Sequence, residues 1–429
     1  MNFSQRQAII IGVGAVLALV FLVLVVLNIK SGPDKVVEVQ LSVWGTENKK
    51  VFESIMEGYS TFRTNAEVTY TQINENRYEE ELLDALAAGR GPDVFFIDNN
   101  ALFRQKNKLT PINRTQLDLV RLRDIFPQVV EQDFVSEGEI YALPLYIDTL
   151  SLVYNKDLFD QASVVFPPGT WQDFQGTVQV LRKVGINGKI LQAGAAIGGS
   201  DKSISNAQDI LYLLMLQNGV PMVNSSFSSA DFSAQKGLGL QAFNFYTQFA
   251  NIVSPYYTWN DSQPEFLESF GRGETAMIFA YKKQIDSFQD GSPFLNYAVV
   301  PAPQPAGTDK SLSYSDYDGL AVSGQSKVKT WAWDFILYAT TRPQVATTYL
   351  DLTKRPPALR SLISEKINDE TFGVFARQAL TARSWKQADD LRIEKIISNA
   401  ISNVLTGKED TKKALDNAER QVTEIMKER

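Results

Sequence analysis

The chain has 429 residues, with 42 basic and 49 acidic side chains and a formal net charge of −7. This length allows two domains with separate cores, and the acidic balance does not suit nucleic acid, which is bound by clustered lysine and arginine. The sequence contains neither cysteine nor histidine, which excludes thiol nucleophiles, imidazole bases and thiolate metal sites, so we expect no metal, no cofactor and no nucleic-acid partner.

Residues 8–27 form an apolar run, AIIIGVGAVLALVFLVLVVL, without a charged or strongly polar side chain. About 20 such residues in a helix span roughly 30 Å, the thickness of the hydrocarbon core of a membrane. The run ends in VVLNIKSGPDK, which lacks the small-residue pattern of a signal-peptide cleavage site. We therefore expect residues 1–35 to be an uncleaved anchor and linker of a single-pass protein of the cell membrane, with an extracytoplasmic body. The flanking charges do not decide the orientation, but a large C-terminal domain can be translocated regardless of them.

The segments after the linker alternate between strand and helix patterns. Apolar and polar residues alternate in 37–43, which predicts a strand, and apolar residues recur at helical spacing in 51–62. A second strand is expected at 67–71 and a second helix at 78–87. The wholly apolar run 94–97 is typical of a strand that is covered on both faces. This alternation predicts a parallel α/β sheet.

Sheets of this kind bind ligands beyond the carboxyl ends of their strands. Two segments lie there, 44–47 after the first strand and 98–100 after the third. Neither is a phosphate-binding loop, because the sequence has no GxxxxGK[ST] pattern and no GxGxxG that opens a helix. Their carboxylates and amides can exchange hydrogen bonds with hydroxyl groups, so Trp44, Glu47 and Asp98 are candidate site residues.

Several longer motifs follow one another in a characteristic order. They are AAGRGPDVFF at 87–96, YALPLYIDTLSLVYNKDLF at 141–159 with PPGTW at 167–171, RGETAMIF at 272–279, YAVVPAPQ at 297–304, and ISNVLTGKEDTKKALDNAERQVTEI near the C-terminus. In this order they resemble the family 1 extracellular solute-binding proteins, the sugar-binding type of ABC importers and the group that includes maltose-binding protein. The resemblance extends over nearly all of residues 36–429.

The resemblance implies an α/β, two-lobe periplasmic-binding-protein-like fold of type II with three interlobe crossings, here preceded by one transmembrane helix. The expected boundaries are 36–147 and 319–353 for lobe one, and 148–316 and the C-terminal helices 354–429 for lobe two. The segment 316–319 resembles the second crossing, and Arg355-Pro356-Pro357 resembles the third.

Binding a sugar requires apolar ring faces and a few fixed polar groups. The resemblance places Asp148 where sugar-binding relatives often carry an acid that faces the cleft, and Tyr281 loosely where they stack an aromatic ring on the ligand. Tyr146 and Tyr317 lie near crossings. The expected ligand-binding set is therefore Trp44, Glu47, Asp98, Tyr146, Asp148, Tyr281 and Tyr317.

Most of these residues also have a purely structural interpretation. Trp44 fits a core position, Glu47 and Asp98 fit helix caps, Asp148 fits a solvated loop, and Tyr317 fits hinge packing. Three other features are interpreted as structural. They are Trp171 at the start of a helix capped by Thr170, the solvated helix face Glu79-Glu80-Glu81, and the docking face Leu415, Ala418, Val422 and Ile425.

The resemblance implies a binding protein, not an enzyme, that captures a neutral mono- or oligosaccharide and delivers it to the membrane subunits of an ABC importer. Ligand would bridge both lobes and shift the equilibrium toward the closed form. Because Lys282, Lys283 and Arg355 are expected near the cleft and could pair with an anion, an anionic ligand remains an alternative. Two alternatives remain open, an anchored extracellular glycosidase that uses Asp98 and Asp148 as its carboxylate pair, and a ligand-sensing component of a signalling receptor.

Overall fold

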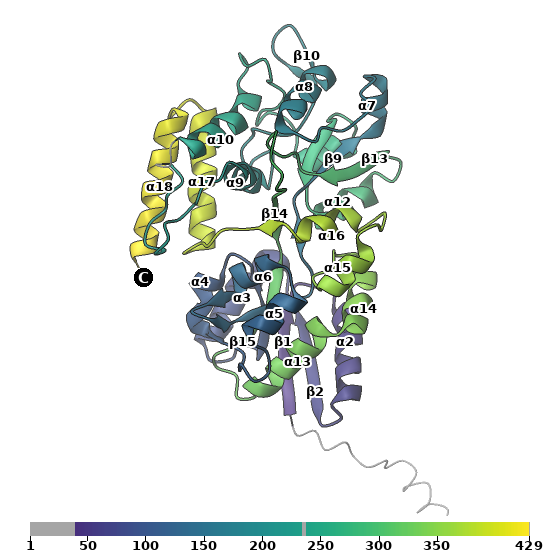
Figure 1. Ribbon diagram of the computed structural model, residues 1–429, viewed down its shortest axis with the longest axis vertical. Coiled ribbons are helices and arrows are strands. Elements are labelled where there is room, and N and C mark those ends of the chain that lie inside the picture. Colours follow the sequence, from purple (N-terminus) through teal and green to yellow (C-terminus); the bar gives the residue numbers. More distant parts are fainter. Residues whose placement is uncertain (1–38, 234–236, 429) are drawn as a thin grey trace, which may run out of the picture.

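The computed structural model describes residues 39–233 and 237–428, which fold into two lobes (Figure 1). Residues 8–27, the expected membrane anchor, lie outside the described residues. Within the part that the structure describes, no helix is both long and apolar enough to cross a membrane. The buried apolar side chains form two separate clusters, one in each lobe.

The first lobe, the lower one in Figure 1, is built on a six-stranded sheet in the order β2-β1-β3-β15-β4, with β7 also paired to β15. β1 (Val39–Gly45) is parallel to both β2 (Ala66–Gln72) and β3 (Val94–Asp98), which confirms the three predicted strands. β15 (Asp318–Ser323) runs antiparallel to β3. The sheet is therefore mixed and not parallel, because β15 enters it from the other lobe after a long excursion of the chain.

Two helices of this lobe follow from local sequence signals. α2 (Lys49–Phe62) begins after Asn48 and α3 (Glu75–Ala87) begins after Asn74, and each asparagine side chain accepts a hydrogen bond from a backbone N–H of the first turn. The remaining elements of the lobe are α4 (Leu102–Gln105), η1 (Lys106–Lys108), β4 (Leu109–Thr110), α5 (Leu119–Ile125), α6 (Gln128–Phe134), β5 (Val135–Ser136), β6 (Glu139–Ile140), β7 (Ala142–Pro144), α13 (Lys329–Thr341), α14 (Pro343–Thr353) and α15 (Arg360–Lys366).

The second lobe surrounds an antiparallel sheet in the order β12-β9-β13, of which β12 is buried and β13 is partly exposed. Its elements are β9 (Ser151–Asn155), α7 (Lys156–Gln161), α8 (Trp171–Leu181), β10 (Lys183–Val184), β11 (Ile190–Gln192), α9 (Ala207–Gln217), α10 (Leu238–Thr247), η2 (Gln248–Ala250), α11 (Phe266–Gly271), β12 (Met277–Ala280), α12 (Lys282–Gly291), β13 (Tyr297–Pro301), α17 (Asp390–Leu405) and α18 (Thr411–Lys427). The Thr170 hydroxyl caps α8 and Trp171 is buried, as predicted. The predicted apolar face of α18 is also buried.

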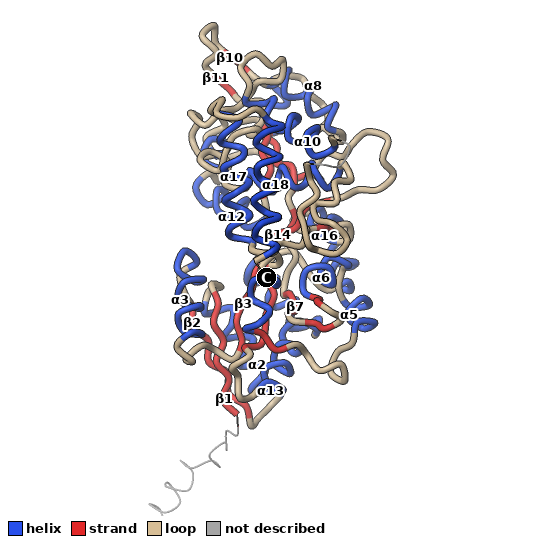
Figure 2. Tube along the Cα trace, turned by 90° about the vertical axis from the view of Figure 1, so that its left-hand side faces the viewer, coloured by secondary structure: helices blue, strands red, loops and turns tan. Residues whose placement is uncertain are grey.

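The lobes are joined by a small sheet in the order β16-β14-β8, and Figure 2 shows β14 where the two lobes meet. β14 (Ser313–Asp316) is antiparallel to β8 (Asp148–Thr149) and parallel to β16 (Ala382–Arg383). The third connection also contains α16 (Gly373–Ala379), which packs against β8 and β14.

The chain changes from one apolar cluster to the other at each of these connections. Ile147 belongs to the first cluster and Leu150 to the second. The side chains of α15, including Ile363, still pack in the first cluster, whereas Trp385 packs in the second. The third passage therefore lies later in the chain than the Arg355-Pro356-Pro357 segment.

Candidate ligand-binding cleft

A cavity of about 830 Å³ lies between the two lobes. Small-molecule sites have volumes of roughly 300–1,000 Å³, so this cavity is large enough for an oligomeric ligand. The first lobe contributes α3, the end of β3 and the start of β15, and the second lobe contributes α9, α12 and α17. A ligand in this cavity would touch both lobes.

The lining of the cavity is polar and strongly acidic. Carboxylates outnumber cations by nine to three. The carboxylates are Glu75, Glu79, Asp98, Asp148, Asp209, Asp316, Asp318, Asp390 and Glu394, and the cations are Arg104, Lys283 and Arg355. Among the residues that the structure describes, no group of three or more of these side chains could hold a metal ion.

Four of the seven site residues expected from the sequence line the cavity, namely Asp98, Tyr146, Asp148 and Tyr281. Asp98 ends β3, and one of its oxygens accepts a hydrogen bond from the backbone N–H of Asn100 at 2.7 Å. Asp98 lies directly opposite Asp318 in the antiparallel pair of β3 and β15. Burial, and then the charges of Asp316 and Asp390, raise the pKa of Asp98 well above its usual range.

Asp148 is 2% exposed and not solvated. Its carboxylate accepts hydrogen bonds from the backbone N–H groups of Thr149 at 2.8 Å, Lys282 at 3.0 Å and Lys283 at 3.2 Å. The last two N–H groups form the N-terminus of α12, where a negative charge is stabilised. Burial raises the pKa of Asp148 to about 6, against the effect of these hydrogen bonds. Asp148 therefore fixes α12 to the hinge strand β8 at the edge of the cavity.

Tyr146 and Tyr281 present hydroxyl groups to carboxylates and do not present open ring faces. Both residues are 4% exposed. The Tyr146 hydroxyl donates to Asp318 at 2.9 Å, and the guanidinium of Arg355 lies over its ring, 4.6 Å from the centroid. The Tyr281 hydroxyl donates to Asp209 at 2.9 Å. The ring of Tyr281 belongs to the core of the second lobe, which leaves little surface for stacking on a ligand.

Trp44 and Glu47 lie outside the lining of the cavity. Trp44 is half-buried and packs against the core of the first lobe, as its structural interpretation predicts. Glu47 does not cap α2, a role that belongs to Asn48. Its carboxylate instead accepts hydrogen bonds from Tyr349 at 3.0 Å and from Arg355 at 3.2 Å. Glu47, which lies outside the lining, therefore fixes the position of Arg355, a cation of the lining.

Tyr317 is also outside the lining. It is buried and packs edge-on against Phe134, and its hydroxyl donates to Asp133 at 2.8 Å. Asp133 also accepts hydrogen bonds from Asn99 and Ser384. Ser384 follows β16, so this buried cluster connects the second and third crossings to the first lobe. The position of Tyr317 matches the hinge-packing interpretation.

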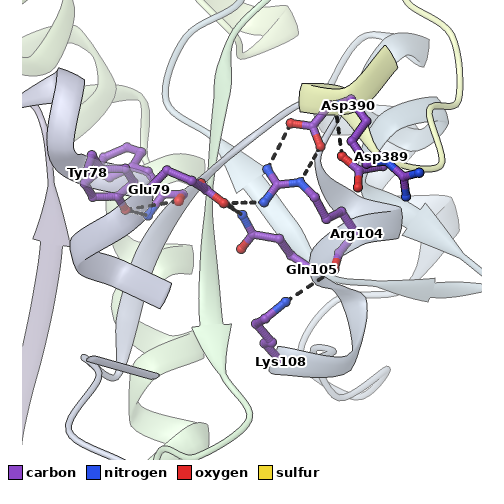
Figure 3. Close-up of polar contacts among 9 residues, drawn as sticks. Tyr78, Glu79, Arg104, Gln105, Lys108, Asp389 and Asp390 are labelled. Atoms are coloured by element: carbon purple, nitrogen blue, oxygen red, sulfur yellow. Dashed lines mark hydrogen bonds and ion pairs between the residues drawn. The ribbon is translucent and has the colours of Figure 1, made fainter. Parts of the chain in front are cut away.

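Arg104 of α4 forms ion pairs on both sides of the cleft (Figure 3). It donates to both oxygens of Asp390 in the second lobe, at 2.6 and 2.9 Å, and it also contacts Glu79 of α3 in the first lobe. A second pair between the lobes joins Lys283 to Glu75. The prediction that Glu79 belongs to a solvated helix face was wrong, because Glu79 pairs with Arg104. Arg104 comes from a separate segment of the chain, so the sequence of α3 alone could not reveal this partner.

Four buried groups of the lining have no hydrogen-bond partner in the described structure. They are the hydroxyls of Tyr212 and Tyr314 and the side-chain oxygens of Asn100 and Asn206. Tyr212 and Tyr314 are 3% and 1% exposed. Buried polar groups are nearly always paired, so these atoms are suited to receive a polar ligand. Sequence reasoning missed Tyr212 because α9, which carries it, is apolar and buried almost all round.

The fold and the cavity define a two-lobed protein that binds a small ligand between its lobes. Residues 57–372 match the family model described as bacterial extracellular solute-binding protein, and the chain belongs to this family. The chain is 25% identical over 338 residues to a maltotriose-binding protein of Pyrococcus abyssi, which covers 75% of this chain and 65% of that relative. It is 22% identical over 391 residues to the maltodextrin-binding protein MdxE of Bacillus subtilis, covering 89% and 88% of the two chains.

Solved structures share the two-lobed fold. The cyclic alpha-maltosyl-1,6-maltose binding protein from Arthrobacter globiformis superposes with a TM-score of 0.76 at 16% identity, covering 91% of this chain and 99% of that one. A cyclo/maltodextrin-binding protein complexed with maltotetraose gives a TM-score of 0.74 at 19% identity, covering 91% and 96%. The two-lobe fold expected from the sequence is therefore confirmed.

Proposed function

We propose that this protein is an extracytoplasmic receptor that captures a carbohydrate between its lobes and delivers it to an ABC importer. The observation that carries the proposal is the cavity of about 830 Å³ whose polar lining comes from both lobes. Relatives are named as binding proteins for maltotriose, for maltodextrin and, in a further protein of Bacillus subtilis, for galactooligosaccharide, and one structural neighbour is described as an ABC transporter solute-binding protein. Carboxylates and amides suit the hydroxyl groups of such ligands.

The arrangement of the lining supports capture by closure of the lobes. Asp98 and Asp318 come from the first lobe, and Asp209 and Glu394 come from the second. A ligand that contacts both sets binds more tightly to the closed form than to the open form and shifts the equilibrium accordingly. The importer would then recognise the closed form.

Hydrolysis is the competing function. Asp98 and Asp148 line the same cavity, and the pKa of Asp98 is raised, as for a general acid. Three backbone N–H groups, however, occupy the carboxylate of Asp148, which is the second member of the pair. A carboxylate engaged in this way is a poor nucleophile, so the geometry favours binding over turnover.

Calorimetric titration of the purified full-length chain with maltotriose, longer maltodextrins and galactooligosaccharides tests the proposal. We expect saturable binding of at least one of these sugars, and unchanged sugar on chromatography after prolonged incubation. Release of shorter sugars would overturn the receptor function in favour of a glycosidase. A matched control is Glu424→Gln, which removes an exposed carboxylate of α18 outside the cavity lining.

The apolar run 8–27 supports attachment of this receptor to the membrane by a single span. The full-length chain is expected in the membrane fraction after carbonate washing, whereas a chain that begins at residue 36 is expected in the soluble fraction. Recovery of the full-length chain in the soluble fraction would contradict the anchor without affecting the proposed sugar binding.

A further inference from the structure

The acidic lining of the cleft is not balanced by its three cations, because each of them is already paired. Arg104 is bound to Glu79 and Asp390. Lys283 is bound to Glu75. Arg355 is bound to Glu47, behind the lining. These pairs neutralise three of the nine lining carboxylates and leave the others for a ligand.

None of the six remaining carboxylates belongs to an ion pair in the described part of the chain. Asp148 accepts hydrogen bonds from three backbone N–H groups, and Asp318 accepts one from Tyr146. The other four are Asp98 at the end of β3, Asp209 on α9, Asp316 at the end of β14 and Glu394 on α17. Their elements come from both lobes and from the hinge. Asp316 is exposed to the cavity, and no side-chain hydrogen bond within the described structure engages it or Glu394. The nearby charges of Lys283 and Arg355 act on Asp316, but both cations are held by other carboxylates.

The strands also place acids directly opposite one another. Asp98 faces Asp318 across β3 and β15, and Asp316 faces Asp148 across β14 and β8. Like charges in directly opposed positions of an antiparallel pair destabilise a sheet. Hydrogen bonds already engage Asp148 and Asp318, and a cation that enters the cavity between the opposed acids would reduce the remaining repulsion.

The cavity offers hydrogen-bonding groups to a neutral sugar but little aromatic surface on which its rings could stack. Among the described residues that line it, no tryptophan or phenylalanine occurs. Its four tyrosines are Tyr146, Tyr212, Tyr281 and Tyr314, and all four are at most 4% exposed. Little of their ring surface is therefore available for stacking on a ligand.

We infer that the ligand is a saccharide that carries at least one protonated amine, with the ammonium group held among Asp98, Asp209, Asp316 and Glu394. This inference rests on the proposed function and narrows its ligand class. The ammonium group offsets the repulsion among carboxylates that are partly removed from water. The sugar hydroxyls bind the partnerless hydroxyls of Tyr212 and Tyr314 and the oxygen of Asn206. Sugar phosphates and uronic acids are disfavoured by the same charges.

Calorimetry with matched disaccharides tests the inference on the full-length chain at neutral pH. The probes are the β-1,4-linked disaccharide of glucosamine, its di-N-acetylated form, cellobiose, maltotriose and 1,6-diaminohexane. We expect the free amino sugar to bind at least about tenfold more tightly than its acetylated form and than either neutral sugar, because acetylation removes the charge and keeps the ring. The diamine is expected to bind at least about tenfold more weakly than the amino sugar, because it lacks hydroxyl groups.

Variants locate the ammonium group. Asp316→Asn and Glu394→Gln are each expected to reduce the preference for the free amine by about tenfold, whereas Glu424→Gln on the outer face of α18 leaves it unchanged. Melting curves of the variants without ligand verify that each is folded, and the ratio of two affinities measured on one variant is independent of small changes in stability.

The outcomes separate this inference from the proposed function. Neutral sugars that bind as tightly as the amino sugar would overturn the inference and leave the carbohydrate receptor intact. If the diamine binds as tightly as the amino sugar, the ligand need not be a saccharide, which would overturn both the proposed carbohydrate receptor and the inferred amino-sugar ligand. An unchanged preference in Asp316→Asn and Glu394→Gln would overturn the assigned position of the ammonium group. If no sugar binds at all, the proposed function itself fails.

Discussion

The guanidinium of Arg104 in the first lobe binds both carboxylate oxygens of Asp390 in the second, at 2.6 and 2.9 Å, although the two residues are 286 positions apart in the chain. Their side chains are only 15% and 12% exposed. Asp390 is the first residue of α17, where the positive end of the helix dipole also acts on it. This pair holds the lobes together on the side of the cavity formed by α3, α4 and α17.

Replacing Arg104 by methionine is expected to favour the open arrangement of the lobes. The change leaves the carboxylates of Asp390 and Glu79 without their cation, which we expect to destabilise the closed form by about 2 kcal/mol. Small-angle X-ray scattering without ligand should show a larger radius of gyration. Arg77→Met is the control, because Arg77 pairs with Glu81 on the exposed surface of α3, within the first lobe. Equal radii for the two variants would contradict the role of Arg104.

Asp133 gives the protein a pH-dependent stability. Burial raises its pKa to about 7 from the usual 3.8, and this effect exceeds the opposing hydrogen bonds from Ser384, Tyr317 and Asn99. The folded protein therefore holds the Asp133 proton more tightly than the unfolded chain, so the free energy of unfolding falls as the pH rises from 3.8 to about 7. The contribution of the Asp133 proton to stability is complete below this pH window and lost above it.

Asp133→Asn should remove this contribution, so that the variant loses less stability than the wild type across the same window. Urea unfolding at a series of pH values measures the difference. Glu131→Gln on the same helix is a control of opposite sign, since Arg123 lowers the pKa of Glu131 and its contribution is lost as the pH falls. Parallel pH profiles for wild type and Asp133→Asn would show that Asp133 is not the responsible group.

Asp148 should matter more for the stability of α12 than for direct contact with ligand. Asp148→Ala removes the acceptor of three backbone N–H groups and should lower the free energy of unfolding by about 2 kcal/mol. Asp148→Asn keeps one acceptor oxygen and should recover about half of the loss. Denaturant unfolding of both variants measures this order, and an alanine variant as stable as the wild type would contradict it.

Removing the partnerless hydroxyls of Tyr212 and Tyr314 should change the stability of the unliganded protein and its affinity for ligand in opposite directions. Tyr212→Phe and Tyr314→Phe remove buried groups without a partner, so the unliganded protein should gain about 0.5–1 kcal/mol while ligand affinity falls several-fold. Tyr59→Phe is the matched control, because the Tyr59 hydroxyl donates to Asp334 at 2.9 Å and its loss should destabilise the protein. Phenylalanine variants that lose stability without ligand would show that these hydroxyls are already paired.

The first half of lobe one could be predicted because its signals are local. Alternation in β1, helical spacing in α2 and the wholly apolar run of β3 each depend on a few adjacent residues. The antiparallel β15 depends on a strand that returns after the whole first part of lobe two, and no local pattern in 318–323 reveals its direction.

The candidate site could be predicted only in part, for a related reason. Asp98 was found because strand ends mark the edge of a sheet where ligands bind. Asp209 and Glu394 were missed because they lie on helices whose sequences read as ordinary packing elements. Tyr281 was expected as a stacking ring, but its orientation depends on the distant Asp209, which holds its hydroxyl.

The sheet of β8, β14 and β16 ties the three connections between the lobes side by side. Three separate linkers would let one lobe tumble in many directions relative to the other, whereas strands bonded laterally confine the motion to bending about nearly one axis. Fewer relative orientations are then lost when a ligand fixes the lobes, so the entropic penalty of capture is smaller. More of the contact energy in the cleft therefore appears as affinity.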